Sequence, residues 1–319
     1  MSSPAVDRAI RILDFLATHP AEQFTLSELS RRLMISKATA HGVLATLAAK
    51  GYVQRHGRSQ TYRLGPALVP LGAVTERTLP AVEHGHAQIR ALAGKYDVES
   101  SLSFATETEI VIIAHEGVPR PLGITGQAGQ RLPLVPPFGV VFMAWEAPER
   151  VSAWLRRLGP RATPEELARS RNALAAVRRR GWAFALRTEA QVRLAELYSR
   201  GPDEIHTSRA QAELDRVMAD FARSGYLDEA PVGNEDAAVQ YISAPVFGPE
   251  GTMVLAMNIV PGDGFSARDL PELGEALRRA AGEVTLMIHG RRPEFTYDGD
   301  SAPETMSDLA NSRAEGSSF

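Results

Sequence analysis

The sequence has 319 residues, of which 44% are hydrophobic and 23% are charged. These values are ordinary for a globular protein and exclude a fully disordered or collagen-like chain, and the length predicts two domains. The absence of cysteine excludes disulfides, thiolate zinc sites and cysteine nucleophiles. No stretch reaches the roughly 18 apolar residues of a membrane span, and the first residues lack the pattern of a signal peptide. We therefore expect a cytoplasmic protein with no membrane partner.

The net charge of −3 hides an uneven distribution of charge along the chain. Residues 1–80 contain ten Lys and Arg against five Asp and Glu, whereas residues 81–319 contain 25 against 33. No acidic residue lies between Glu28 and Glu76, a stretch that contains seven basic residues. A region with charge of one sign favours a polyanionic partner, although a solvated charged face gives the same pattern.

The amino-terminal region shows three helix patterns. Apolar residues recur at helical spacing from Val6 to Leu16, and the following His19-Pro20 pair ends that helix. Residues 25–28 read as a capping box that opens a second, short helix. Ser36 can cap a third helix, which Gly51 ends. Two short helices joined by a tight turn form a helix-turn-helix, which places its second helix in the major groove of DNA.

A hairpin is predicted directly after the third helix. Residues 52–56 and 60–64 favour strands, and the link of residues 57–59 begins with glycine, so the pair would form a wing whose arginines reach phosphates. A three-helix interaction or dimerisation module without a nucleic-acid role is the alternative. On the DNA-binding interpretation, the contacts to DNA are expected from Ser27, Ser36, Lys37, Thr39, His41, Arg55, Arg58 and Arg63.

Residues 5–72 resemble the winged helix-turn-helix of IclR-type transcriptional regulators. The resemblance covers "AVDRAIRILDFLATHP", "TLSELSRRLMISKATAHGVLATLAAKGYV" and "YRLGPALVPLG" in order and spacing. The family often carries arginine after the histidine of the recognition helix, where this chain has Gly42. A glycine inside a helix costs about 0.5–1 kcal/mol relative to alanine. We therefore expect Lys37, Thr39 and the wing to carry more of the contact with DNA.

The remainder of the chain alternates strand and helix patterns. Residues 66–80 read as a linker helix. Strand patterns follow at residues 101–105, 110–114, 122–125, 182–186, 241–247 and 253–260. Helix patterns lie at residues 82–96, 140–145, from 148, 164–180 and after Ser266. Hairpins with flanking helices predict an α+β domain on an antiparallel sheet.

The resemblance to IclR-type regulators extends into this part through "GQAGQRLPLVPPFGVVFMAW" and "YISAPVFGPEGTMVLAMNIV". It implies a GAF-like domain that binds a small molecule between sheet and loop, although a packed core would show the same pattern. Val135, Pro137 and Tyr241 replace smaller or more polar residues of the family. This bulkier lining favours an aromatic, acyl or terpenoid-like carboxylic effector over a very small acid. The implied lining residues are Gly129, Leu132, Phe138, Gly139, Met143, Tyr241, Met257 and Asn258.

The sequence lacks the common motifs of enzymes. The sequence contains no Gly-x-Ser-x-Gly elbow, P-loop or Rossmann glycine pattern. His84 and His86 lie two apart on a predicted helix, so their side chains diverge rather than share a metal. We therefore expect no catalytic residue, no metal site and no cofactor.

These observations predict an α+β protein with a winged helix-turn-helix (1–65), a linker helix (66–80) and an effector-binding and oligomerisation domain (81–290). That domain carries a helical insertion at about 188–224, and a disordered tail follows (291–319). The expected function is a ligand-responsive regulator that binds a partly palindromic double-stranded operator as a homodimer or homotetramer. The alternatives are a small-molecule-binding or catalytic domain with a helical interaction module, and a constitutive DNA-binding protein whose large domain only dimerises.

Overall fold

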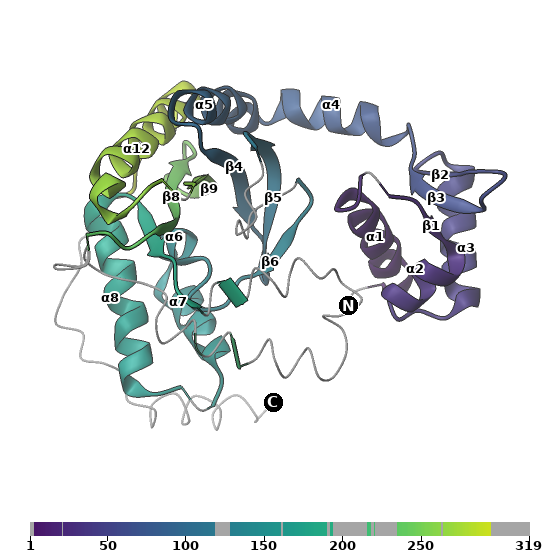
Figure 1. The fold of residues 1–319 in the computed structure, drawn as a ribbon, viewed down its shortest axis with the longest axis horizontal. Helices are drawn as coiled ribbons and strands as arrows, with labels where there is room; N and C mark the ends of the chain where they lie inside the picture. Colours follow the sequence, from purple (N-terminus) through teal and green to yellow (C-terminus); the bar gives the residue numbers. More distant parts are fainter. Residues whose placement is uncertain are drawn as a thin grey trace.

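The computed structural model shows two units joined by a helix (Figure 1). We call residues 3–65 the amino-terminal unit and the part from residue 80 onward the sheet unit. The structure describes residues 3–20, 22–118, 128–160, 162–189, 192–193, 216–217, 220, 235–262 and 264–294. The predicted strand at 122–125, most of the insertion and the tail beyond 294 lie outside these residues.

The amino-terminal unit contains the three predicted helices, α1 (Pro4–Ala17), α2 (Leu26–Arg32) and α3 (Lys37–Ala49). The capping box is confirmed at α2, because Thr25 Oγ1 accepts from the Glu28 amide while Glu28 Oε2 accepts from the Thr25 amide. The helices pack their apolar sides on a core that includes Ile12, Phe15, Phe24, Leu29, Leu44 and Tyr62.

The predicted wing is present as the hairpin of β2 (Val53–Arg55) and β3 (Thr61–Leu64). A further strand that we did not predict, β1 (Phe24–Thr25), pairs with β3 on its other side. The order β1-β3-β2 ties the wing to the residues that open α2.

The helix α4 (Leu68–Thr78) connects the units, and α5 (Pro80–Tyr96) follows it as the first helix of the sheet unit. They separate at Leu79, as expected for a residue before proline, which disfavours helical backbone. The helix α4 buries none of its own side chains, and its Val69, Leu71 and Val74 are exposed.

The sheet unit is an α+β fold on one antiparallel six-stranded sheet, as the sequence predicted. The strand order is β6-β5-β4-β9-β8-β7, and every neighbouring pair is antiparallel. The strands are β4 (Glu99–Ala105), β5 (Glu109–Glu116), β6 (Arg131–Pro133), β7 (Ala183–Leu186), β8 (Val239–Phe247) and β9 (Met253–Val260).

Helices cover both faces of this sheet. On one face, α5 and α12 (Leu270–Met287) pack on a core that includes Ile89, Leu102, Ile242 and Leu277. The other face is covered by α6 (Val140–Met143), α7 (Pro148–Leu155) and α8 (Pro164–Arg180). Short 3-10 helices lie at Arg156–Leu158 and Ala267–Asp269. Ser266 therefore caps a 3-10 turn that precedes α12, rather than α12 itself.

Among the described residues, no helix combines the length and apolar character that crossing a membrane requires.

Candidate nucleic-acid interface and ligand pocket

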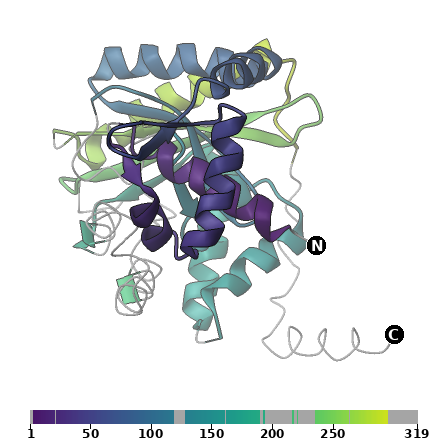
Figure 2. The ribbon, with the colours of Figure 1, turned by 90° about the vertical axis from the view of Figure 1, so that its right-hand side faces the viewer.

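The buried residues of α3 determine which side of this helix faces the core and which side faces solvent. Ala40 and Leu44 are fully buried, whereas Lys37 and His41 are exposed. Figure 1 shows α1 on the side of the amino-terminal unit that faces the sheet unit, with α3 on the far side. In Figure 2, which looks onto that far side, α3 lies in front of α1. The outer side of α3 is therefore open to a partner.

The first turn of α3 carries three of the predicted contact residues. Ser36 caps the helix by accepting from the Thr39 amide at 3.1 Å, and the two hydroxyl oxygens lie 2.8 Å apart. Lys37 in the same turn is exposed, and Ser27 at the start of α2 is also exposed. Helix N-termini carry partial positive charge and free amides, so this end of α3 suits a phosphate oxygen.

The wing presents its arginines outward. Arg55, Arg58 and Arg63 are all exposed. Arg63 donates from Nε and Nη2 to Gln54 Oε1 at 3.0 and 2.8 Å, which holds its guanidinium over the hairpin. The Arg55 guanidinium lies 5.8 Å from the ring centroid of Tyr62. Arg55 and Arg63 thus extend from strands, whereas Arg58 lies in the turn between the two strands.

The departure from the family pattern at Gly42 lies on this surface. Gly42 is exposed, and a Cβ built on it would meet no atom within 4 Å. Its carbonyl accepts from Thr46 Oγ1 at 2.9 Å, which is a bond within the helix. Packing therefore does not require glycine at this position.

A small cavity of about 50 Å³ lies between the sheet and α6. Of the residues that we predicted to line a pocket, it brings together Leu132, Phe138, Gly139, Tyr241 and Asn258. Sequence reasoning missed Ser103 and Ser243, which also line it. The further lining residues are Ile110, Ile112, Val140, Val141, Phe142 and Ala183.

The floor of this cavity is a buried polar network across three strands. Register places Ser101 and Ser243 directly beside Asn258 on either side. Ser243 Oγ donates to Asn258 Oδ1 at 2.7 Å, and Asn258 Nδ2 lies 3.0 Å from Ser103 Oγ as a donor. Buried polar groups are costly unless they are paired, so mutual pairing stabilises them here. A serine hydroxyl has further hydrogen-bonding capacity that it can offer to a ligand.

Gly139 shapes the wall opposite the floor. Its φ is +86°, and a Cβ on it would lie 2.2 Å from Leu134 Cδ1. The positive φ therefore favours glycine where α6 begins, and a Cβ there would also force the Leu134 side chain to move.

Three predicted lining residues lie elsewhere. Met257 is fully buried on the opposite face of β9 with the α5 and α12 core, because neighbouring residues of a strand point to opposite faces. Met143 is buried in the core beside the cavity. Gly129 lies against α1, where a Cβ on it would be 3.2 Å from Ala17 Cβ.

His86 pairs with a carboxylate that an arginine also contacts. His86 Nε2 lies 2.9 Å from Glu116 Oε1, which Arg90 also contacts at 2.9 Å. The hydrogen bond from Arg90, followed by that from His86, lowers the pKa of Glu116. Within the described part of the chain, no group of three or more His, Asp or Glu side chains is placed to hold a metal ion.

The chain resembles known regulators most clearly in its first residues. A family model described as the IclR helix-turn-helix domain matches residues 5–57. The HTH-type transcriptional regulator BhcR of Paracoccus denitrificans is 35% identical over 88 residues, which are 28% of this chain and 31% of BhcR. The chain covers less than two thirds of the length of several such curated relatives.

Solved structures extend the likeness of fold to nearly the whole chain. An IclR transcriptional regulator from Alicyclobacillus acidocaldarius matches with a TM-score of 0.62 and 21% identity, covering 91% of this chain and 100% of that one. An IclR homologue from Microbacterium hydrocarbonoxydans, complexed with 4-hydroxybenzoate, matches with a TM-score of 0.57 and 18% identity, covering 89% and 98%. Residues 5–57 therefore match the IclR helix-turn-helix domain, and nearly the whole chain shares the fold of solved IclR-type regulators.

Proposed function

We propose that this chain is a transcription regulator that binds double-stranded DNA through α3 and the wing and responds to a small organic effector in its sheet unit. In this proposal, residues 1–65 bind DNA, 66–80 link the domains, and 81–290 bind the effector and pair with further copies. The proposed DNA contacts are the eight residues predicted from the sequence, namely Ser27, Ser36, Lys37, Thr39, His41, Arg55, Arg58 and Arg63.

The observation that carries the DNA-binding proposal is the composition of the outward side of the amino-terminal unit. The exposed turn of α3 with Lys37 and His41 lies on the same unit as the three exposed wing arginines. No acidic residue occurs between Glu28 and Glu76 to offset these charges. A one-signed surface beside a helix that can enter a groove supports binding to a polyanionic duplex.

A mobility-shift experiment tests this proposal. The full chain is titrated onto the DNA upstream of its own gene at two salt concentrations, with excess competitor DNA. A discrete, competitor-resistant complex that Lys37→Ala weakens supports the proposal. Lys95→Ala on α5 is the matched control, because it removes the same charge outside the DNA-facing surface. Absence of any complex, or equal effects of both substitutions, contradicts it.

The chemistry of the cavity supports an effector with an aromatic body and a hydrogen-bonding group. Its walls are apolar or aromatic, including Phe138 and Leu132, while its floor offers Ser103, Ser243 and Asn258. The Microbacterium homologue binds 4-hydroxybenzoate, which has this combination of groups. The cavity is smaller than the roughly 300–1000 Å³ of drug-sized ligand sites, so binding requires a small ligand or a shift of its walls.

The effector proposal is tested by thermal unfolding in the presence of 4-hydroxybenzoate and a panel of related acids and phenols. All three tryptophans lie in the sheet unit, so their fluorescence reports on the part that would bind. A ligand at 100 times its Kd stabilises the folded state by about 2.7 kcal/mol. A saturable rise in the unfolding temperature supports the proposal, and no rise with any member of the panel contradicts it.

Assembly follows from the helix-turn-helix. Two helix-turn-helix units in one dimer bind half-sites that lie about one turn of the DNA helix apart. We therefore propose a homodimer or homotetramer on a partly palindromic operator. An effector that favours one arrangement of the two DNA-binding units over another would change the fraction of the protein whose geometry matches the operator. Sedimentation of the protein with and without DNA tests this point, and a single copy on the duplex would contradict it.

A further inference from the structure

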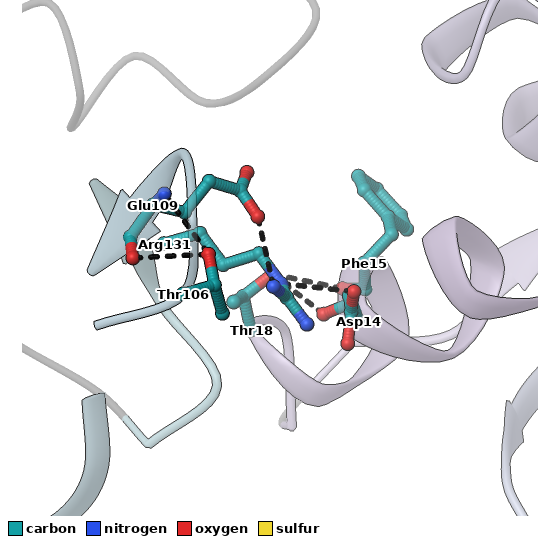
Figure 3. A network of polar contacts seen from close by, with 6 residues as sticks. All are labelled: Asp14, Phe15, Thr18, Thr106, Glu109 and Arg131. Atoms are coloured by element: carbon teal, nitrogen blue, oxygen red, sulfur yellow. Dashed lines mark hydrogen bonds and ion pairs between the residues drawn. The ribbon is translucent and has the colours of Figure 1, made fainter. Parts of the chain in front are cut away.

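The two units touch each other away from the linker. The C-terminal turn of α1 lies against the residues that lead into β6, where a Cβ on Gly129 would be 3.2 Å from Ala17 Cβ. Beside this contact, Arg131 Nε lies 3.0 Å from Asp14 Oδ2 (Figure 3). An ion pair therefore joins β6 of the sheet unit to α1 of the amino-terminal unit.

Arg131 is held from both sides. Its Nη1 donates to Glu109 Oε2 at 2.9 Å, and the Glu109 amide donates to Thr106 Oγ1 at 3.0 Å. Arg131 and Asp14 are each about a third exposed, at 32% and 33%. Burial lowers the pKa of Arg131, but the carboxylates of Asp14 and Glu109 outweigh burial and raise it. The guanidinium is therefore charged and partly withdrawn from solvent, a setting in which an ion pair is screened less than at the surface.

The same two strands form a wall of the cavity on their other side. Ile110 and Leu132 are direct partners in the β5–β6 ladder, and both line the cavity. Arg131 pairs with Val111 in that ladder. Because successive side chains of a strand point to opposite faces, Arg131 lies on the back of the wall that Leu132 forms. A displacement of β6 by the contents of the cavity would move Arg131 as well.

The linker does little to fix the angle between the units. All the side chains of α4 are at least partly exposed, so this helix has no packed core of its own with either unit. The contacts of α1 with β6 are thus well placed to set how the amino-terminal unit is oriented. Since α1 and α3 share one core, fixing α1 also fixes α3.

We propose that Arg131 is a positioning residue that latches α1 to the back of the cavity wall through Asp14, and that it passes movements of β6 to α3. The regulatory meaning of this latch rests on the proposed function. The existence of the latch as a mechanical link does not rest on that function, because the orientation of the amino-terminal unit relative to the sheet unit can be measured without DNA or effector.

The absence of cysteine allows the latch to be tested with spin labels on Ala45→Cys in α3 and Glu272→Cys in α12 of the full chain. Labelled protein is diluted with unlabelled protein, so that only distances within one copy are measured by pulsed electron spin resonance. A single narrow distance is expected. Arg131→Ala and Asp14→Asn should each lose it and give a broad distribution, while Arg131→Lys should retain most of it.

Asp7→Asn is the matched control, because it removes the same charge from an exposed position of α1. Unfolding followed by tryptophan fluorescence shows whether each variant keeps the fold of the sheet unit. If Arg131→Ala and Asp14→Asn leave the distance distribution as narrow as Asp7→Asn does, the latch is refuted.

A second pair of variants tests the link to the cavity. Leu132→Ala and Val140→Ala each truncate a buried side chain of the cavity wall, but only Leu132 belongs to β6. Leu132→Ala should broaden the distance distribution and Val140→Ala should not. Equal behaviour of the two variants would refute the coupling while leaving the latch itself standing on the first test. Loss of DNA binding in the mobility-shift experiment would overturn the proposed function without altering either result.

Discussion

Gly42 offers a substitution whose effect can be worked out from its surroundings. It lies inside α3, is exposed, and leaves open space where a Cβ would be. A glycine in a helix interior costs about 1 kcal/mol relative to alanine. Because a Cβ at this site would meet no other atom, no steric clash would reduce the stabilisation gained with alanine. Gly42→Ala should therefore stabilise α3 by about 1 kcal/mol, which corresponds to roughly a fivefold change in an opening equilibrium.

Amide hydrogen exchange over residues 37–49 measures this directly, since it reports local opening. Protection of these amides should rise about fivefold, which follows from about 1 kcal/mol. All three tryptophans lie in the sheet unit and provide an internal control. Their fluorescence should report the same unfolding transition of the sheet unit in Gly42→Ala as in the unaltered chain. Protection that is unchanged or lower in Gly42→Ala would refute the reasoning from open space.

The same position tests the DNA-facing assignment when it receives a charge. Gly42→Arg places a cation on the outer side of α3, and each phosphate neutralised steepens the dependence of log K on log salt by about 0.9. Gly72→Arg on α4 is a matched control, because its site is equally open and lies outside α3. A salt slope that is the same in the two variants would contradict the placement of α3 against the duplex.

Three further substitutions test other parts of the structure. Gly139→Ala should destabilise the sheet unit by about 1–3 kcal/mol, because Gly139 has a positive φ and no room for a Cβ; an unchanged urea midpoint by tryptophan fluorescence would contradict this. The backbone and side-chain hydrogen bonds from Thr25 lower the pKa of Glu28, so its stabilising effect is complete above the unfolded pKa of about 4.3 and is lost as the pH falls through the lower folded value. Glu28→Gln should remove that part of the acid dependence in circular dichroism, and an identical pH profile would count against the capping box. Tyr241→Ala should reduce the thermal shift caused by a ligand while leaving effector-free DNA binding intact; loss of both would indicate a structural role.

Local rules predicted the elements of the fold well. Thr25 with Glu28 forms the capping box that their spacing indicated, and Thr163 with Glu166 forms a second one by the same spacing at the start of α8. Gly181 ends α8 with a φ of +86°, as a glycine after a helix commonly does. These features depend on residues within one turn of each other, so the sequence contains all that is needed to predict them.

The cavity was predicted only in part, because its lining depends on strand register. Asn258 lies on the cavity floor while its neighbour Met257 is buried in the opposite core. A shift of one residue exchanges the two faces of a strand, and the resemblance did not fix the register. Ser103 and Ser243 could have been found only by pairing β4, β9 and β8 correctly, since they meet through Asn258.

Contacts between distant segments were beyond the sequence patterns. β1 has only two residues, Phe24 and Thr25, and exists because β3 pairs with it. Asp14 and Arg131 lie in different units, and each taken alone reads as an ordinary surface charge. Their proximity follows from the packing of whole elements, which no local periodicity encodes.

The most direct test of the account is the salt dependence of DNA binding for the unaltered chain and for Arg58→Ala. Arg58 is exposed on the wing, whereas Arg279→Ala on α12 serves as a control of equal charge. We predict that log K falls linearly with log salt and that Arg58→Ala lowers the slope by about 0.9, as expected for the loss of one phosphate contact. A slope unchanged in Arg58→Ala, or lowered equally in Arg279→Ala, would contradict the assignment of the wing to DNA.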